Sequence, residues 1–189
     1  MPLFQLLNVP KDSQDWEIFS FSLRDQITNI QKSIFQKYSQ VLSIEVTNGG
    51  FYTVATGFPT IAIVGGNGKN AAAEVSEGTN GVIQQIAVTN GGEYYTSTPQ
   101  VVFSSGTATA IAKVGATVNL EQYELYPVDF NKSQDWLTNV EQSMDDINSV
   151  LGLQSVDLED VDLKDQKQLE SWVNLLYQEL YTASSALGI

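Results

Sequence analysis

Short segments in the middle of the chain alternate apolar and polar residues or consist of β-branched residues. The clearest examples, between Leu42 and Val114, are LSIEVT, TIAIV, AAAEVS, VIQQIAVT, QVVF and TATAIAKV. A period of two predicts strands that bury one face of a sheet. We therefore predict an antiparallel β domain over residues 43–119.

Residues before this region have a helical period instead. The apolar positions that define the first stripe are Leu23, Ile27, Ile30, Ile34 and Val41. A spacing of three and four residues is typical of an amphipathic helix, which we place from Leu23 to Tyr38. Ser22 and Asp25 have the spacing of a capping box at its start.

Two further apolar stripes follow the β region. One consists of Val140, Met144, Ile147 and Leu151, before Gly152. The other consists of Leu169, Val173, Leu176, Leu180, Ala183 and Leu187, before Gly188. Glycine is a common helix terminator, so each stripe predicts a helix that ends there. The predicted fold is α+β, with residues 1–42 as an arm and helix, and residues 120–189 as an acidic helical segment that packs with it.

The β region contains an internal repeat. The segment IEVTNGGFY begins at Ile44, and IAVTNGGEY begins 42 residues later at Ile86. Asn-Gly pairs favour positive φ angles, so the pairs Asn48-Gly49 and Asn90-Gly91 are predicted turns that reverse the chain. Three short strands cannot bury a face alone. We predict two copies of a unit of about 42 residues that cover each other or pair across subunits.

The helical regions also share short motifs. The tetrapeptide SQDW occurs at Ser13 and again at Ser133, and each tryptophan lies just before or at the start of a striped helix. Trp16, Trp136 and Trp172 are therefore candidate anchors, together with Leu169, Val173, Leu176 and Leu180. One interpretation is that the tryptophans lock the helices of one chain together. The alternative is that some of them dock into a partner subunit, because tryptophan is enriched at interface centres.

Composition narrows the chemistry that is open to the chain. The 189 residues include no cysteine and no histidine, which excludes disulfides, thiolate or histidine metal sites and histidine-based triads. We predict no catalytic residue, no metal site and no cofactor. Carboxylate, hydroxyl and amine groups remain.

Charge is distributed unevenly. Nine basic and 22 acidic residues give a net charge of −13, and residues 120–189 contain fourteen acids and three bases. A field of this sign repels phosphate backbones, so direct nucleic-acid binding is not expected. The first residues, MPLFQLLNVPKDSQDW, have neither a basic start nor a long apolar run, so we expect synthesis in a cytoplasm and no membrane span.

Three local patterns partly resemble a calcium loop, a phosphate-binding loop and a pair of catalytic carboxylates. The acidic segment from Asp157 to Asp165 lacks the glycine and glutamate of an EF-hand loop, so we predict a solvated linker with Asp162 or Asp165 near a helix start. The segment GGNGK from Gly65 lacks the upstream glycine and following Ser or Thr of a phosphate loop, which leaves a hairpin loop. The carboxylates considered for glycoside hydrolysis, and interpreted as solvent-facing, are Glu45, Glu74, Glu77 and Glu93.

Aromatic residues beside the repeated turns suggest one further possibility. These residues are Phe51, Tyr52, Tyr94 and Tyr95. Aromatic faces can stack on sugars, so a carbohydrate-binding adhesion module for host glycans is one hypothesis. Packing at strand ends is the alternative.

The helical segments FSFSLRDQITNIQKSI and WLTNVEQSMDDINSVLGL resemble small structural proteins of tailed bacteriophages, in which short tryptophan-led helices recur. The turn segment VTNGGFY is similar to β-repeat units of phage virion and fibre-associated proteins. The resemblance implies a non-enzymatic virion component that is made in the host bacterial cytoplasm. Its expected place is the tail, baseplate or fibre adaptor, and the alternative is a decoration protein of the capsid head.

The resemblance and the apolar stripes also bear on partners. Other virion proteins are the implied partners. The narrow helix stripes suggest coiled-coil contacts and a homo-oligomer, for which a trimer is one form.

Overall fold

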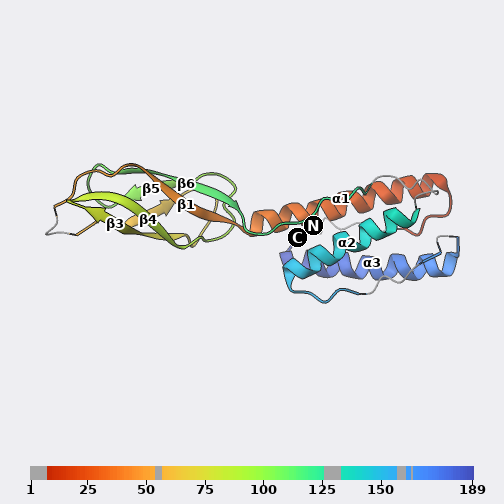
Figure 1. The fold of residues 1–189 in the computed structure, drawn as a ribbon. Helices are drawn as coiled ribbons and strands as arrows, with labels where there is room; N and C mark the ends of the chain where they lie inside the picture. Colours follow the sequence, from red (N-terminus) through yellow and green to blue (C-terminus); the bar gives the residue numbers. More distant parts are fainter. Residues whose placement is uncertain (1–7, 54–56, 126–132, 157–160, 163) are drawn as a thin grey trace. The chain divides into compact units, whose positions relative to one another are not determined.

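The computed structural model describes residues 8–53, 57–125, 133–156, 161–162 and 164–189 (Figure 1). The fold is α+β, with helices from both ends of the chain and six strands between them. The chain divides into two compact units. The helical unit comprises Met1–Ile34 and Asn119–Ile189, and the β unit comprises Phe35–Val118.

The first helix, α1, spans Ser13–Lys37 and so begins ten residues before the predicted start at Leu23. The Asp12 carboxylate caps it by accepting hydrogen bonds from the backbone N–H groups of Gln14 and Asp15, both at 2.9 Å. The prediction of a capping box at Ser22 and Asp25 is therefore wrong, because both residues lie inside the helix.

The other two helices agree with their apolar stripes. Helix α2 spans Ser133–Leu151 and α3 spans Gln166–Leu187. Both predicted glycine stops are confirmed, since Gly152 and Gly188 have positive φ angles of 67° and 72°. Asp165 caps α3 with bonds from the N–H groups of Lys167 and Gln168. Within the described part of the chain, no helix combines the length and the hydrophobicity that a membrane span requires.

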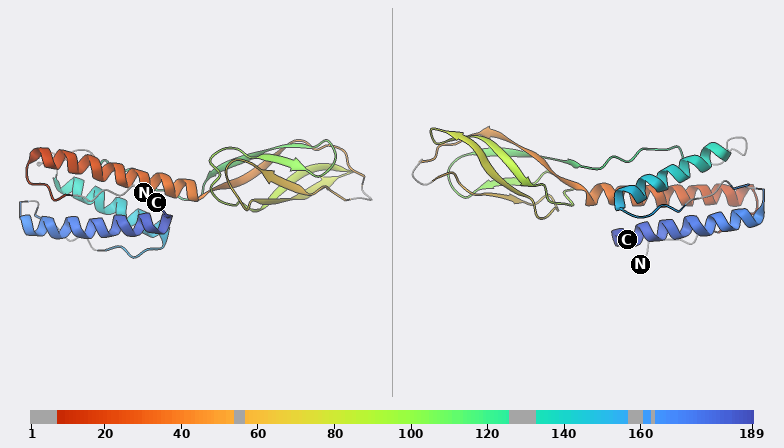
Figure 2. Two further views of the ribbon diagram at one scale, coloured as in Figure 1. Left: turned by 180° about the vertical axis from the view of Figure 1, so that it is seen from behind. Right: turned by 60° about the horizontal axis from the view of Figure 1, so that its bottom comes forward.

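The three helices of the helical unit run in the same direction (Figures 1 and 2). The contacts between α2 and α3 agree: Trp136 meets Trp172 near their starts, and Asn148 meets Glu179 further along both helices. Short links join antiparallel helices, so parallel ones need return segments. Residues 119–125 belong to such a segment, and they bury Leu120 and Leu125 in the helical unit.

The β unit is one antiparallel sheet with the strand order β2-β5-β6-β1-β4-β3. Its strands are β1 (Ser39–Asn48), β2 (Ile61–Val64), β3 (Ala72–Thr79), β4 (Val82–Asn90), β5 (Gln100–Phe103) and β6 (Thr109–Ala116). All six segments that were predicted as strands are strands. The predicted domain boundary at residue 43 falls inside β1.

The sheet curls until β2 and β3, at the two ends of its order, approach each other. Its inner face forms a core of its own, made by Val41, Ile44, Tyr52, Ile83, Ile86, Tyr95 and Ala112. β1 and β4 lie side by side, and Ile44 is opposite Ile86 in the register. The two segments that share the repeated motif therefore pair directly with each other.

The tight hairpin of the β unit is not at the repeated turns. Thr79 pairs with Val82, and the two residues between them, Asn80 and Gly81, have φ angles of 53° and 79°. Two successive positive φ angles define the type I′ turn that Asn-Gly favours. The pairs Asn48-Gly49 and Asn90-Gly91 instead begin the longer loops from β1 to β2 and from β4 to β5.

Candidate functional site

The three tryptophans meet in one aromatic cluster in the helical unit. The Trp136 ring centroid lies 6.2 Å from that of Trp16 and 6.0 Å from that of Trp172. Phe19 joins the cluster at 6.4 Å from Trp136 and 6.3 Å from Trp172. Tilted and edge-to-face pairs at these distances are favourable beyond the area that they bury.

Helix geometry explains why these rings meet. Trp16 and Trp136 lie in the first turns of α1 and α2, and Trp172 lies in the second turn of α3. Because the helices are parallel, their first turns are at the same end of the unit. All three tryptophans are at least 94% buried. They are core residues of one chain, which is the first of the two interpretations given above.

The predicted anchors of α3 lie in the same core. Leu169, Val173, Leu176 and Leu180 are almost completely buried. The buried stripe of α1 has the same role, with Leu23, Ile27, Ile30 and Ile34 inside the unit. These stripes are therefore covered by other helices of the same chain and are not available to a second copy.

The repeated turns are held by side chains. Asn48 Oδ1 accepts a hydrogen bond from the Gly50 N–H at 2.9 Å, and Asn90 Oδ1 accepts one from the Gly92 N–H at 2.9 Å. This is the Asx turn, in which a side-chain amide replaces a backbone carbonyl. A Cβ atom on Gly49 would overlap the carbonyl oxygen of Ile83, so the close approach of β1 and β4 requires glycine there.

The aromatic residues beside these turns divide into buried and exposed ones. Tyr52 and Tyr95 belong to the core of the β unit. Tyr94 is half-buried, and the Lys69 ammonium lies 5.4 Å from its ring centroid. Phe51 is 71% exposed. Of the four residues considered for sugar stacking, Phe51 is the one whose ring is mostly open to solvent.

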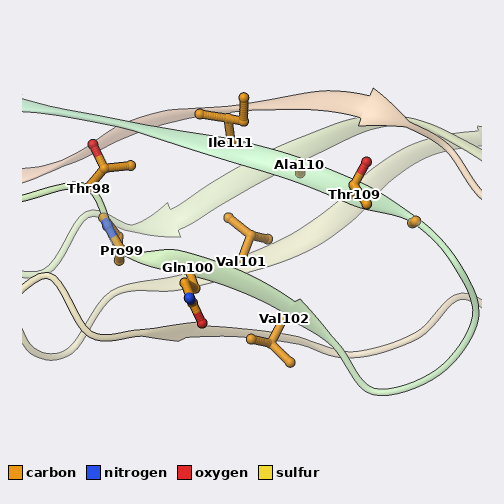
Figure 3. A pocket seen from close by; sticks show the side chains of 9 residues that line it. Thr98, Pro99, Gln100, Val101, Val102, Thr109, Ala110 and Ile111 are labelled. Atoms are coloured by element: carbon orange, nitrogen blue, oxygen red, sulfur yellow. The ribbon is translucent and has the colours of Figure 1, made fainter.

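A hollow of about 420 Å³ lies between β5 and β6 (Figure 3). The two strands pair at Gln100 and Ile111 and then separate toward the loop that joins them. Val102 and Ile111 expose 44% and 54% of their surface beside it. None of the described residues that line it is charged: Thr98, Pro99, Gln100, Val101, Val102, Ala108, Thr109, Ala110 and Ile111.

A second hollow, of about 260 Å³, lies in the helical unit between α1 and residues 122–125. Arg24, Thr28 and Gln31 line one side of it, and Tyr123 lines the other. Burial raises the pKa of Tyr123, and hydrogen bonds from its hydroxyl to Asp146 at 3.1 Å and Glu121 at 3.2 Å contribute to the rise, which brings the pKa to about 12. This tyrosine therefore stays protonated at neutral pH.

The carboxylates that were weighed as catalytic pairs are spread over the β unit. Glu45 pairs with Lys113 at 3.0 Å, and Glu93 pairs with Lys69 at 3.3 Å. Glu74 and Glu77 are exposed. Across the described residues, no group of three or more carboxylates is placed to hold a metal ion. Asp157, Glu159 and Asp160 of the acidic segment lie outside the described residues, whereas Asp165 caps α3.

Glu179 on α3 is a buried carboxyl group to which the sequence analysis gave no role. It is 5% exposed. Its Oε1 accepts hydrogen bonds from Asn148 Nδ2 of α2 at 3.1 Å and from the Val156 backbone N–H at 2.7 Å. Its Oε2 is buried, and none of the described residues forms a hydrogen bond with it. The sequence feature that could have indicated its burial is the position of this acid in the apolar stripe, between Leu176 and Leu180.

Comparison of the chain with protein-family models, curated proteins and solved structures finds no match.

Proposed function

We propose that the protein is a non-enzymatic building block of a tailed-phage virion, fixed to the particle by its helical unit and displaying its β unit. A tail, baseplate or fibre-adaptor position is the place we propose. The motif resemblance described above supports the phage assignment. The observation that carries the rest of the proposal is the division of the chain into two compact units, with the β unit inserted between the two parts of the helical unit.

This arrangement suits a joint between other proteins. Each unit has its own buried core, the aromatic cluster in one and the inner face of the sheet in the other. Two chain connections lead from the helical unit to the inserted β unit. The β unit is therefore connected to the helical unit at both of its ends.

A homo-oligomer would need a surface other than the helix stripes. Those stripes are buried inside the chain. The proposal therefore places contacts with other virion proteins on the exposed faces of the two units.

We also propose that the β unit consists of two copies of one folding unit, β1–β3 and β4–β6. Matching backbone hydrogen bonds support this. The Val41 N–H donates to the Gly91 carbonyl at 2.8 Å, and the corresponding Ile83 N–H donates to the Gly49 carbonyl at 3.0 Å. Each copy thus donates the equivalent backbone hydrogen bond to the other copy.

The tyrosines support the same correspondence. The Tyr52 N–H donates to the Gly81 carbonyl at 2.7 Å, and the Tyr95 N–H donates to the Ser39 carbonyl at 3.0 Å. In this proposal Tyr52 corresponds to Tyr95, and not to Tyr94 as the sequence alignment had it. The second copy then has one extra residue in its loop, where Tyr94 has a positive φ of 63°.

The test of the function is to locate the protein in intact particles. We expect it at a fixed copy number in purified phage, with an epitope tag in the β unit labelled at the tail, baseplate or fibre joint. Label on the head would instead favour the decoration protein. Absence from particles that are otherwise complete would contradict both.

A further inference from the structure

Glu179 joins three segments of the helical unit. It lies on α3, Asn148 lies on α2, and Val156 lies on the segment that follows α2. Both bonds end on a single oxygen atom, Oε1. Asn148 is itself buried. The carboxyl group is therefore a fixed part of the packing and not a surface charge.

The surroundings oppose a negative charge at this place. Burial raises the pKa of the Glu179 carboxyl above its ordinary value of 4.5, and the negative field of Asp145 on α2 raises it further. The hydrogen bonds from the Val156 N–H and from Asn148 act in the opposite direction, but they do not cancel the effect of burial. Among the described residues of α1, α2, α3 and the segment after α2, no cation stabilises this carboxylate.

We propose that Glu179 is a proton-sensitive group in the core of the helical unit, and that uptake of a proton by its carboxyl group stabilises the folded helical unit by removing a buried charge. Oε1 can accept the same two hydrogen bonds in the neutral acid. Protonation at Oε2, to which no described residue is hydrogen-bonded, removes a buried charge and the repulsion from Asp145. Acidification therefore stabilises the helical unit at this point.

The direction of the pH effect follows from the two states. In the folded chain the pKa of Glu179 lies above 4.5, the value expected once the side chain is exposed by unfolding. The folded state thus binds the proton more tightly. Stability rises as the pH falls from neutral through the raised pKa, and the gain is complete below the ordinary value.

Glu179→Gln is the direct test, because its amide keeps a carbonyl oxygen for both hydrogen bonds and carries no charge. Glu170→Gln is the matched control, since Glu170 is exposed on the same helix. At pH 7.5 we expect Glu179→Gln to raise the Tm of the helical unit by about 5 °C, and Glu170→Gln by no more than about 1 °C. At pH 5 the advantage of Glu179→Gln should shrink.

Carboxyl carbon NMR of the wild-type protein gives a second readout. The titration midpoint of Glu179 is expected above the ordinary glutamate value of 4.5. Amides of α2 and α3 that exchange through global unfolding of the helical unit should become more protected, after correction for the intrinsic rate, as Glu179 is protonated. Equal Tm shifts for the two variants at pH 7.5, or a Glu179 midpoint at or below 4.5, would overturn the proposal.

Discussion

Each of two buried tyrosine rings in the β unit packs against a glycine of a loop between strands. The Tyr95 ring covers Gly68 in the loop after β2, and the Tyr52 ring covers Gly106 in the loop after β5. At both glycines a Cβ atom would overlap the ring. These loops can approach the core closely because glycine has no side chain.

Gly68→Ala should therefore destabilise the β unit. Gly68 has no positive φ, so the whole cost arises from the overlap with a ring that is packed on all sides. Overpacking of this kind costs about 1–3 kcal/mol, which urea unfolding can measure. Gly65→Ala is the control: its φ is 82° and its Cβ has open space, so it reports backbone strain alone. The explanation is wrong if Gly68→Ala is neutral.

Residue identity predicted some of these roles better than others. Tryptophan at the start of each helix is large and apolar enough that its burial could be anticipated from the sequence. The burial of Tyr52 and Tyr95 could not, because it depends on glycines that are distant in the chain. The hydrogen-bond partners of Glu179 could not be anticipated either, because an acid in an apolar stripe gives no information about partners on other segments.

The Asx turns at the ends of β1 and β4 are the clearest matched pair among the elements. Both use one side-chain oxygen to hold one backbone N–H, at the same distance of 2.9 Å. Asn48→Ala and Asn90→Ala should each lower the free energy of unfolding by about 0.5–1.5 kcal/mol, the net contribution of one such bond. The two costs should be alike if the two turns have the same role.

Asn48→Asp and Asn90→Asp are the controls for this pair, because aspartate keeps the accepting oxygen. Both should stay close to the wild type in urea unfolding. An alanine cost at one turn and none at the other would contradict the proposed equivalence of the two copies.

The spacing of apolar residues predicted the elements better than the capping motif predicted where a helix begins. The alternating pattern predicted all six strands, whereas α1 begins ten residues before its predicted start. The apolar stripe continues back through Phe19 and Trp16 at the same spacing, so the wrong start came from the capping pattern, and Ser20 is a buried polar residue beside the stripe. Its hydroxyl donates to the Glu17 carbonyl at 2.9 Å, so its polarity is satisfied inside the helix. The strand order depends on pairing between distant segments and had no local signal.

The whole molecule combines two cores with an unequal distribution of charge. The segment from residue 120 onward, which supplies α2 and α3, holds fourteen of the 22 acids. The β unit has few charges, and two of its acids are paired with lysines. We therefore propose basic or neutral surfaces as partners of the helical unit, because an acidic partner would be repelled.

The central claim is that the chain consists of two units, each stabilised by its own core. Residue-resolved hydrogen exchange on Gly68→Ala and the wild type tests it most directly, because exchange reports local and global opening separately. The account predicts that the substitution lowers the protection of strands β1 to β6 and leaves the protection of α2 and α3 unchanged. An equal loss of protection in the strands and in α2 and α3 would show one cooperative core and contradict the claim.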